Sequence, residues 1–207
     1  MTKVYHHRRG LSLIELMAAT LIMITLATIG LRLSSDVLRQ HRVVNQVKWV
    51  KTTVLTARGR AIENTAPVRV VYDPGDNSLF AEIDMARDGR FGVSNTRVLI
   101  DKQPSPYEQV IMGTPTGMPT LINWMDGVSA VGPYNGTQPL DLTILPDGRV
   151  METATMRPAL GALFFYVDVN DSPTAAVQFT ATGQLKLAFN GGKKKDGTNW
   201  NDWVWID

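Results

Sequence analysis

The sequence of 207 residues contains no cysteine, and only one of its three histidines, His41, lies beyond the first ten residues. Without cysteine there are no disulfide bonds, thiolate nucleophiles or cysteine-ligated zinc sites. One histidine is too few for a His-rich metal site, and no Ser–His–Asp triad can be assembled around it. No glycine-rich phosphate-binding loop opens a predicted helix. The sequence therefore predicts a chain that is not an enzyme and needs no cofactor, with His41 a solvated residue.

A metal site has one weak candidate. Asp168, Asn170 and Asp171 supply oxygen atoms at close spacing in the segment "YVDVNDSP", and oxygen ligands are the ones that calcium prefers. The full calcium-loop pattern is missing, so a polar turn is the better interpretation of these three residues.

The chain has one long hydrophobic run, from Leu11 to Leu31, in which Glu15 is the only charged residue. Its 21 residues would form a helix about 31 Å long, close to the roughly 30 Å of a hydrocarbon core. The basic residues Lys3, Arg8 and Arg9 precede it, which predicts a cytoplasmic N-terminus. The run is longer than a signal-peptide core, and Arg32 follows directly, so we expect a membrane helix that is retained.

The helical pattern continues beyond the hydrophobic run. Small apolar residues recur every three or four positions and predict one buried seam, with Gln46, Thr52, Thr53 and Thr56 lying off it; the seam residues are Val43, Val47, Val50, Val54, Ala57 and Ala61. Asn64, as a left-handed cap, and Pro67 should end the helix. Residues 32–62 contain seven basic residues and one acidic residue, which suits a membrane-proximal or partner-facing surface.

After Pro67 the hydrophobic period changes from helical to alternating, which predicts a β-rich head. The segments 68–73 and 78–84 flank a "PGDN" turn, and 140–145 and 149–154 flank a "PDG" turn, so each pair reads as a hairpin. Further strands are expected at 96–101, 162–169, 175–180, 184–189 and 203–206. Residues 103–137 are rich in Pro and Gly and predict a long loop. The fold class is therefore α+β.

The N-terminal motif Gly10-Leu11-Ser12-Leu13-Ile14-Glu15, behind a short basic leader, resembles the signature of the type IV pilin and pseudopilin superfamily. The resemblance implies the type IV pilin fold, with a long N-terminal helix packed on a globular head. It implies that a prepilin peptidase cleaves between Gly10 and Leu11 and methylates the new N-terminus. It also implies that Glu15 pairs with the N-terminal amine of Leu11 in a neighbouring subunit and so sets the register of a filament.

The stretch "VLTARGRAIENTAPVRVVYDPGDN" (54–77) resembles the stem-to-head junction of the GspH and FimT group of minor pseudopilins and minor pilins, as does "VQFTATGQLKL" (177–187) more loosely. Residues 1–10 would then be a leader, 11–31 a transmembrane and filament-core helix, 32–63 an amphipathic stem, and 64–207 a periplasmic head. The implied partners are other pilins or pseudopilins, the peptidase and an inner-membrane assembly platform. Arg32 replaces the helix-kinking proline of many pilins, which favours a type II secretion pseudopilin.

Two alternatives stay open. The first is a minor pilin that binds DNA for uptake, because Lys193, Lys194, Lys195 and Trp200 combine cations with an aromatic ring that could stack on bases. Residues 63–207 hold 17 acidic and 11 basic residues, which argues against nucleic acid as a partner. The second alternative is a membrane-anchored periplasmic enzyme or binding protein, which would need a cleft with converging polar groups.

The leader motif makes the first testable prediction. If the chain is processed after Gly10, the assembled protein should begin at Leu11 and carry an N-terminal methyl group. Intact-mass measurement of protein recovered from membranes checks this, and a mature protein that still contains Met1 or Thr2 would contradict it.

Overall fold

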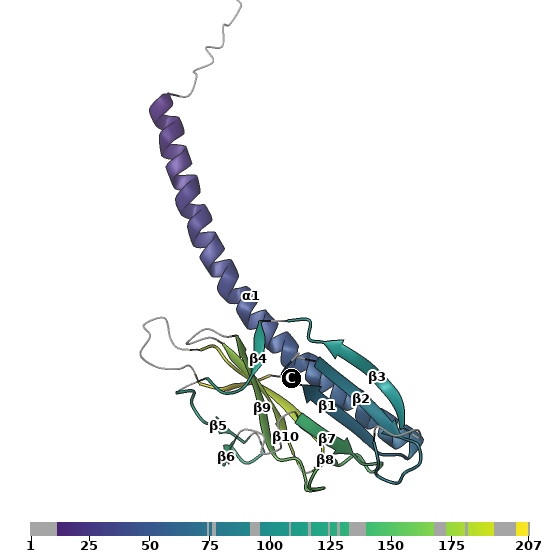
Figure 1. The fold of residues 1–207 in the computed structure, drawn as a ribbon. Helices are drawn as coiled ribbons and strands as arrows, with labels where there is room; N and C mark the ends of the chain where they lie inside the picture. The colour runs from purple at the N-terminus through teal and green to yellow at the C-terminus, as the bar shows by residue number, and fades with distance from the viewer. Residues whose placement is uncertain are drawn as a thin grey trace, which may run out of the picture. The chain divides into compact units, whose positions relative to one another are not determined.

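The computed structural model describes most of the chain after Leu11, in ranges separated by short gaps: residues 12–73, 75, 78–91, 96–107, 109–115, 117–123, 125–127, 129–132, 140–167, 173–180, 182–192 and 202–206. The chain divides into two compact units, 1–38 and 39–207. The expected α+β class is confirmed: the described residues form an N-terminal apolar helix and a head rich in β-sheet (Figure 1).

Helix α1 runs from Leu13 to Asn64 and contributes to both units. Its predicted end is confirmed, but the left-handed residue is Thr65, with φ of 51°, and not Asn64. The amide of Ala66 then donates to the carbonyl of Ala61 over 3.2 Å, which satisfies one of the free carbonyls of the last turn. Pro67 follows and lets the chain leave as a strand.

The described residues of the head form two five-stranded antiparallel sheets. The first sheet has the order β3-β2-β1-β7-β8, with β1 (Val68–Asp73), β2 (Ser78–Asp84), β3 (Thr96–Pro104), β7 (Leu140–Ile144) and β8 (Val150–Glu152). Both predicted hairpins are confirmed, because β1 pairs with β2 and β7 pairs with β8. The long-range step is the pairing of β1 with β7, which sets Val70 opposite Leu142.

The second sheet has the order β12-β11-β10-β9-β4 and collects the C-terminal strands. They are β4 (Val110–Met112), β9 (Gly161–Val167), β10 (Thr174–Phe179), β11 (Leu185–Asn190) and β12 (Val204–Ile206). The strand expected at 203–206 is therefore present, as the edge strand β12 on β11.

One core joins the second half of α1 to the inner faces of both sheets. All six residues of the predicted seam, from Val43 to Ala61, are at most 1% exposed, so the seam is confirmed. Between the sheets, the rings of Tyr72 and Phe165 meet edge to face with centroids 5.6 Å apart. The prediction was wrong for Gln46 and Thr53, which are buried. Gln46 accepts a hydrogen bond from Ser105 over 2.6 Å, a partner that helical periodicity does not reveal.

The segment expected to be a loop, 103–137, holds strands. Besides β4 it forms a small hairpin of β5 (Leu121–Ile122) and β6 (Ala130–Val131). Leu121 and Val131 belong to a second apolar cluster with Phe164 and two small residues of β10 and β11, Ala176 and Ala188. The hairpin therefore contributes to a separate apolar cluster on the second sheet. These strands are two or three residues long, too short for a periodic signal in the sequence.

Arg58 on α1 contacts one turn from each sheet, the turn at Gly148 and the turn at Gly183. Its Nη1 donates to the carbonyl of Gly183 over 3.1 Å, and a Cβ on Gly148 would lie 2.8 Å from its Nε. The two turns also touch, since a Cβ on Gly183 would lie 2.4 Å from the carbonyl oxygen of Gly148. Glycine is needed at Gly183 both for this approach and for its φ of 75°.

This contact predicts a difference between two glycine substitutions. Gly183→Ala should lower the free energy of unfolding by about 3 kcal/mol or more, because left-handed strain adds to a clash with backbone. Gly89→Ala is the matched control: Gly89 has the same φ of 75° but nothing within 4 Å of its Cβ position. It should cost only the strain, about 1–2 kcal/mol. Denaturant unfolding of both variants measures the difference, and equal losses would refute the close approach.

Candidate functional site

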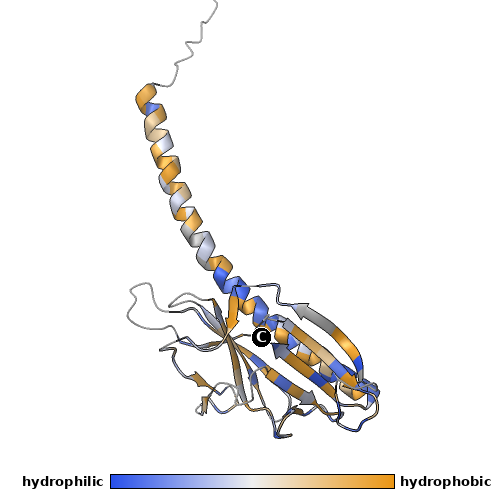
Figure 2. Cartoon of the chain, in the orientation of Figure 1, coloured by the Kyte–Doolittle hydropathy of each residue, from blue (hydrophilic) through white to orange (hydrophobic). Residues whose placement is uncertain are grey.

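The N-terminal part of α1 has a strongly apolar surface. Residues Leu13–Leu31 have a mean hydropathy of 2.0 and none of this stretch is buried, and Figure 2 shows apolar colours along this part of the helix. Its 19 residues are long and apolar enough to cross a membrane; a signal sequence near an N-terminus has the same properties. In either case the exposed side chains need lipid or protein around them.

Ser12 and Glu15 form a reciprocal pair at the start of this helix. The backbone amide of Ser12 donates to Oε2 of Glu15 over 2.9 Å, and the amide of Glu15 donates to Oγ of Ser12 over 3.3 Å. This is a capping box, which satisfies two amides that the first helical turn leaves free. The carboxylate also lies at the positive end of the helix dipole. This role was not foreseen from the sequence, although Ser-x-x-Glu before an apolar run is its usual signal.

Most other predicted site residues lie outside the described part of the chain. This holds for the cleavage pair Gly10 and Leu11 and for the calcium candidates Asp168, Asn170 and Asp171; it also holds for the nucleic-acid candidates Lys193, Lys194, Lys195 and Trp200. Among the residues that the structure describes, no group of three or more His, Asp or Glu side chains is placed to hold a metal ion.

Trp203, close to the predicted nucleic-acid segment, is partly buried in the head. Its Nε1 donates to the carbonyl of Pro119 over 2.9 Å, and its ring lies 5.7 Å from that of Phe164. Trp205 packs on the same apolar cluster. These two rings therefore pack on the head's second apolar cluster.

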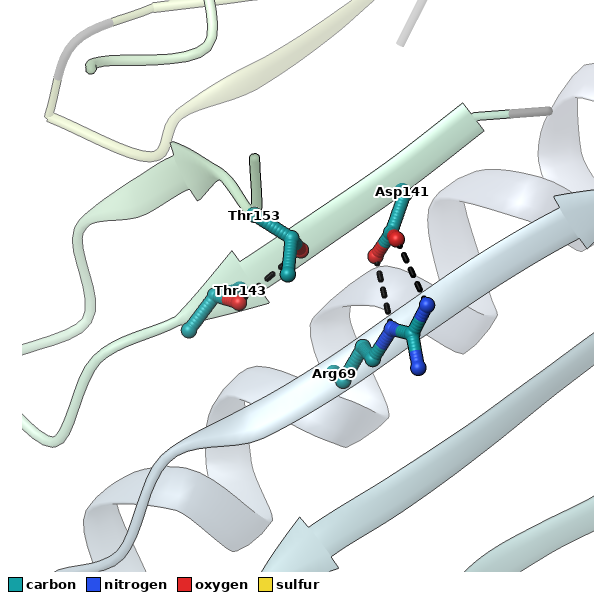
Figure 3. A network of polar contacts seen from close by, with 4 residues as sticks. All are labelled: Arg69, Asp141, Thr143 and Thr153. Atoms are coloured by element: carbon teal, nitrogen blue, oxygen red, sulfur yellow. Dashed lines mark hydrogen bonds and ion pairs between the residues drawn. The ribbon is translucent and has the colours of Figure 1, made fainter. Parts of the chain in front are cut away.

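A polar network on the first sheet was not foreseen from the sequence (Figure 3). Arg69 of β1 donates to both carboxylate oxygens of Asp141 of β7, over 2.8 and 2.7 Å. This hydrogen bonding raises the pKa of Arg69 above its ordinary value, against the opposing effect of burial, and the nearby charges of Asp141 and Glu82 add to the rise. Because 72 residues separate the two partners, only the β1–β7 register brings them together. This ion pair, a fork of two parallel hydrogen bonds, links strands β1 and β7 and therefore has a structural role.

A cavity of about 470 Å³ lies at one end of the second sheet. Its wall is mainly apolar, from Val131, Leu160 and Phe179, and Gln178 and Asn123 are joined there by a 2.7 Å hydrogen bond. No acid, base or nucleophile pair converges on it, so the described residues of this cavity do not form a recognisable catalytic arrangement.

No protein-family model, curated protein or solved structure matches the chain in comparisons with known proteins.

The capping box makes a testable prediction. Ser12→Ala should weaken the first turn of α1 by about 0.5–2 kcal/mol, because the amide of Glu15 loses its acceptor. Ser12→Thr is the control, since threonine also caps. In full-length protein in lipid discs, backbone chemical shifts of residues 13–15 should move toward coil in Ser12→Ala only. Unchanged shifts in both variants would show that Ser12 does not cap the helix.

Proposed function

We propose that the chain is a non-enzymatic filament subunit, a minor pilin or pseudopilin of the GspH and FimT group. The proposal rests on one combination: an exposed apolar helix with a single carboxylate in its first turn, behind the Gly10 leader motif and ahead of a β-rich head. In this proposal the subunit waits in the inner membrane with its head in the periplasm. It is then added to a type II secretion pseudopilus or a type IV pilus.

The exposed helix supports an assembly role because it satisfies the needs of two environments in turn. Its side chains can face lipid acyl chains while the subunit is in the membrane. The same side chains can pack against other apolar helices in a filament core, where van der Waals contacts between helices replace those with lipid. The head, with its own core, would then present surfaces to neighbouring subunits.

Glu15 supports the proposal because a carboxylate in a membrane helix is expensive. At the centre of a span it costs about 2.5–3.5 kcal/mol on insertion scales, and less near an end. The capping bonds to Ser12 reduce this cost in the isolated subunit but leave the negative charge in place. A positive group, such as the new N-terminal amine of a neighbour, would neutralise that charge during assembly.

The decisive test separates the charge of Glu15 from its capping role. Glu15→Val removes both, whereas Glu15→Gln removes the charge and keeps a side-chain oxygen that can accept the Ser12 amide. If the charge fixes register, both variants should lose cross-links between cysteines placed in adjacent stems. Membrane fractionation should find both variants anchored at least as well as wild type, because an insertion cost has been removed.

Other outcomes have distinct meanings. Normal cross-linking in Glu15→Gln together with loss in Glu15→Val would mean that the helix cap matters and the charge does not. Normal cross-linking in both would refute the assembly role of Glu15. Ser12→Thr, which keeps both the cap and the charge, is the control that should assemble normally.

A further inference from the structure

We infer that a groove between the last turns of α1 and the edge strand β3 is a docking site for a protein segment that combines apolar side chains with carboxylates. The groove has a volume of about 310 Å³ and lies wholly within the head. Thr56, Arg60 and Asn64 of α1 form one side of it, and β3 from Arg97 to Ile100 forms the other. The inference concerns this surface alone and holds whatever filament or membrane role the helix has.

The floor of the groove is apolar, because Leu99 and Ile100 line it and pack against the main core. In the pairing of β2 with β3, Glu82 lies opposite Val98 and Ala81 lies opposite Ile100, so Leu99 has no opposite residue. This bulge accompanies the packing of both Leu99 and Ile100 against the core, where each stays only partly buried. Bulges occur often beside functional sites because they redirect side chains. Here the result is an apolar floor that an incoming side chain can cover.

Two exposed apolar residues also line the groove. Met85 is 52% exposed and Val98 is 56% exposed.

Strand β3 is also unusually long for the edge of a sheet. It has nine residues, whereas the edge strands β8, β4 and β12 have three each. Short edge strands protect a sheet from pairing with other chains, and β3 lacks that protection.

The charge of the groove selects the partner. Arg60 and Arg97 line it, and no acidic residue is among its described lining residues. Arg60 already pairs with Glu63, with Nη1 and Oε2 2.7 Å apart. Arg97 is exposed and has no ion-pair or hydrogen-bond partner among the described residues. Arg87 is not a lining residue, but it donates to the carbonyl of Asn64, which lines the groove, over 3.3 Å, so a third cation lies nearby. Carboxylates on the partner would complement this rim.

The test uses full-length protein in detergent with methyl-labelled methionine, because Met85 reports on the groove. The probe is a short peptide of alternating glutamate and leucine, and its matched control has lysine in place of glutamate. The glutamate peptide should shift the Met85 methyl signal saturably. The signals of Met125 and Met156, which are 60% and 49% exposed elsewhere, should stay in place. The lysine peptide should bind at least about tenfold more weakly.

Two variants decide whether the groove is responsible. Arg97→Glu should weaken the glutamate peptide by at least about tenfold, and Arg97→Gln should lie between it and wild type. Arg157→Glu is the matched control, because Arg157 is exposed and lies outside the groove. The inference is overturned by no shift of Met85, by equal responses to both peptides, by equal effects of Arg97→Glu and Arg157→Glu, or by tighter binding of a short DNA duplex.

Discussion

The packing of small residues along one seam of α1 is the contact on which the head depends. Val43, Val50 and Ala61 are among six seam residues that are almost fully buried, and strands from both sheets share the cluster that they enter. Burying one valine side chain is worth about 1.5–3 kcal/mol, against a total stability of about 5–15 kcal/mol for a typical domain. Small side chains also let the helix approach the strands closely, which longer residues would prevent. Without this seam, the two sheets would lose a wall that they have in common.

The same helix has a different composition before the seam, and the two compositions suit different surroundings. From Leu13 to Leu31 the large apolar residues surround the helix on all sides. A helix that is apolar all round needs lipid or other helices as its solvent. From Arg39 onward the buried apolar residues lie on one face of the helix, whereas Lys48 and Arg60 are exposed. In one continuous helix, the first half is therefore suited to a nonpolar medium, and the second half packs into a folded head.

Glu15 gains a second explanation from the structure. A carboxylate in an apolar run suggests a partner in another molecule, yet its nearest partner is Ser12, three residues away in the same chain. Capping and intermolecular pairing are compatible, because a carboxylate has two oxygens and several acceptor sites. The cap holds the carboxylate at the helix end, where a second, cationic group can reach it. Any account of Glu15 therefore has to separate what its charge does from what its hydrogen bonds do.

The long apolar run, the stem seam, the helix end near Asn64 and the two hairpins with Pro-containing turns were all predictable from the sequence. Each is a local pattern, in which residues within a few positions share one face or one turn. Only the tertiary structure decided the β1–β7 pairing, the fork of Arg69 on Asp141, the burial of Gln46 against Ser105, and the contact of Arg58 with Gly183. These partners are 59 to 125 residues apart, and no local period records which distant strand will lie alongside. The groove beside β3 belongs to the same class, because one bulge and the end of a helix form it together.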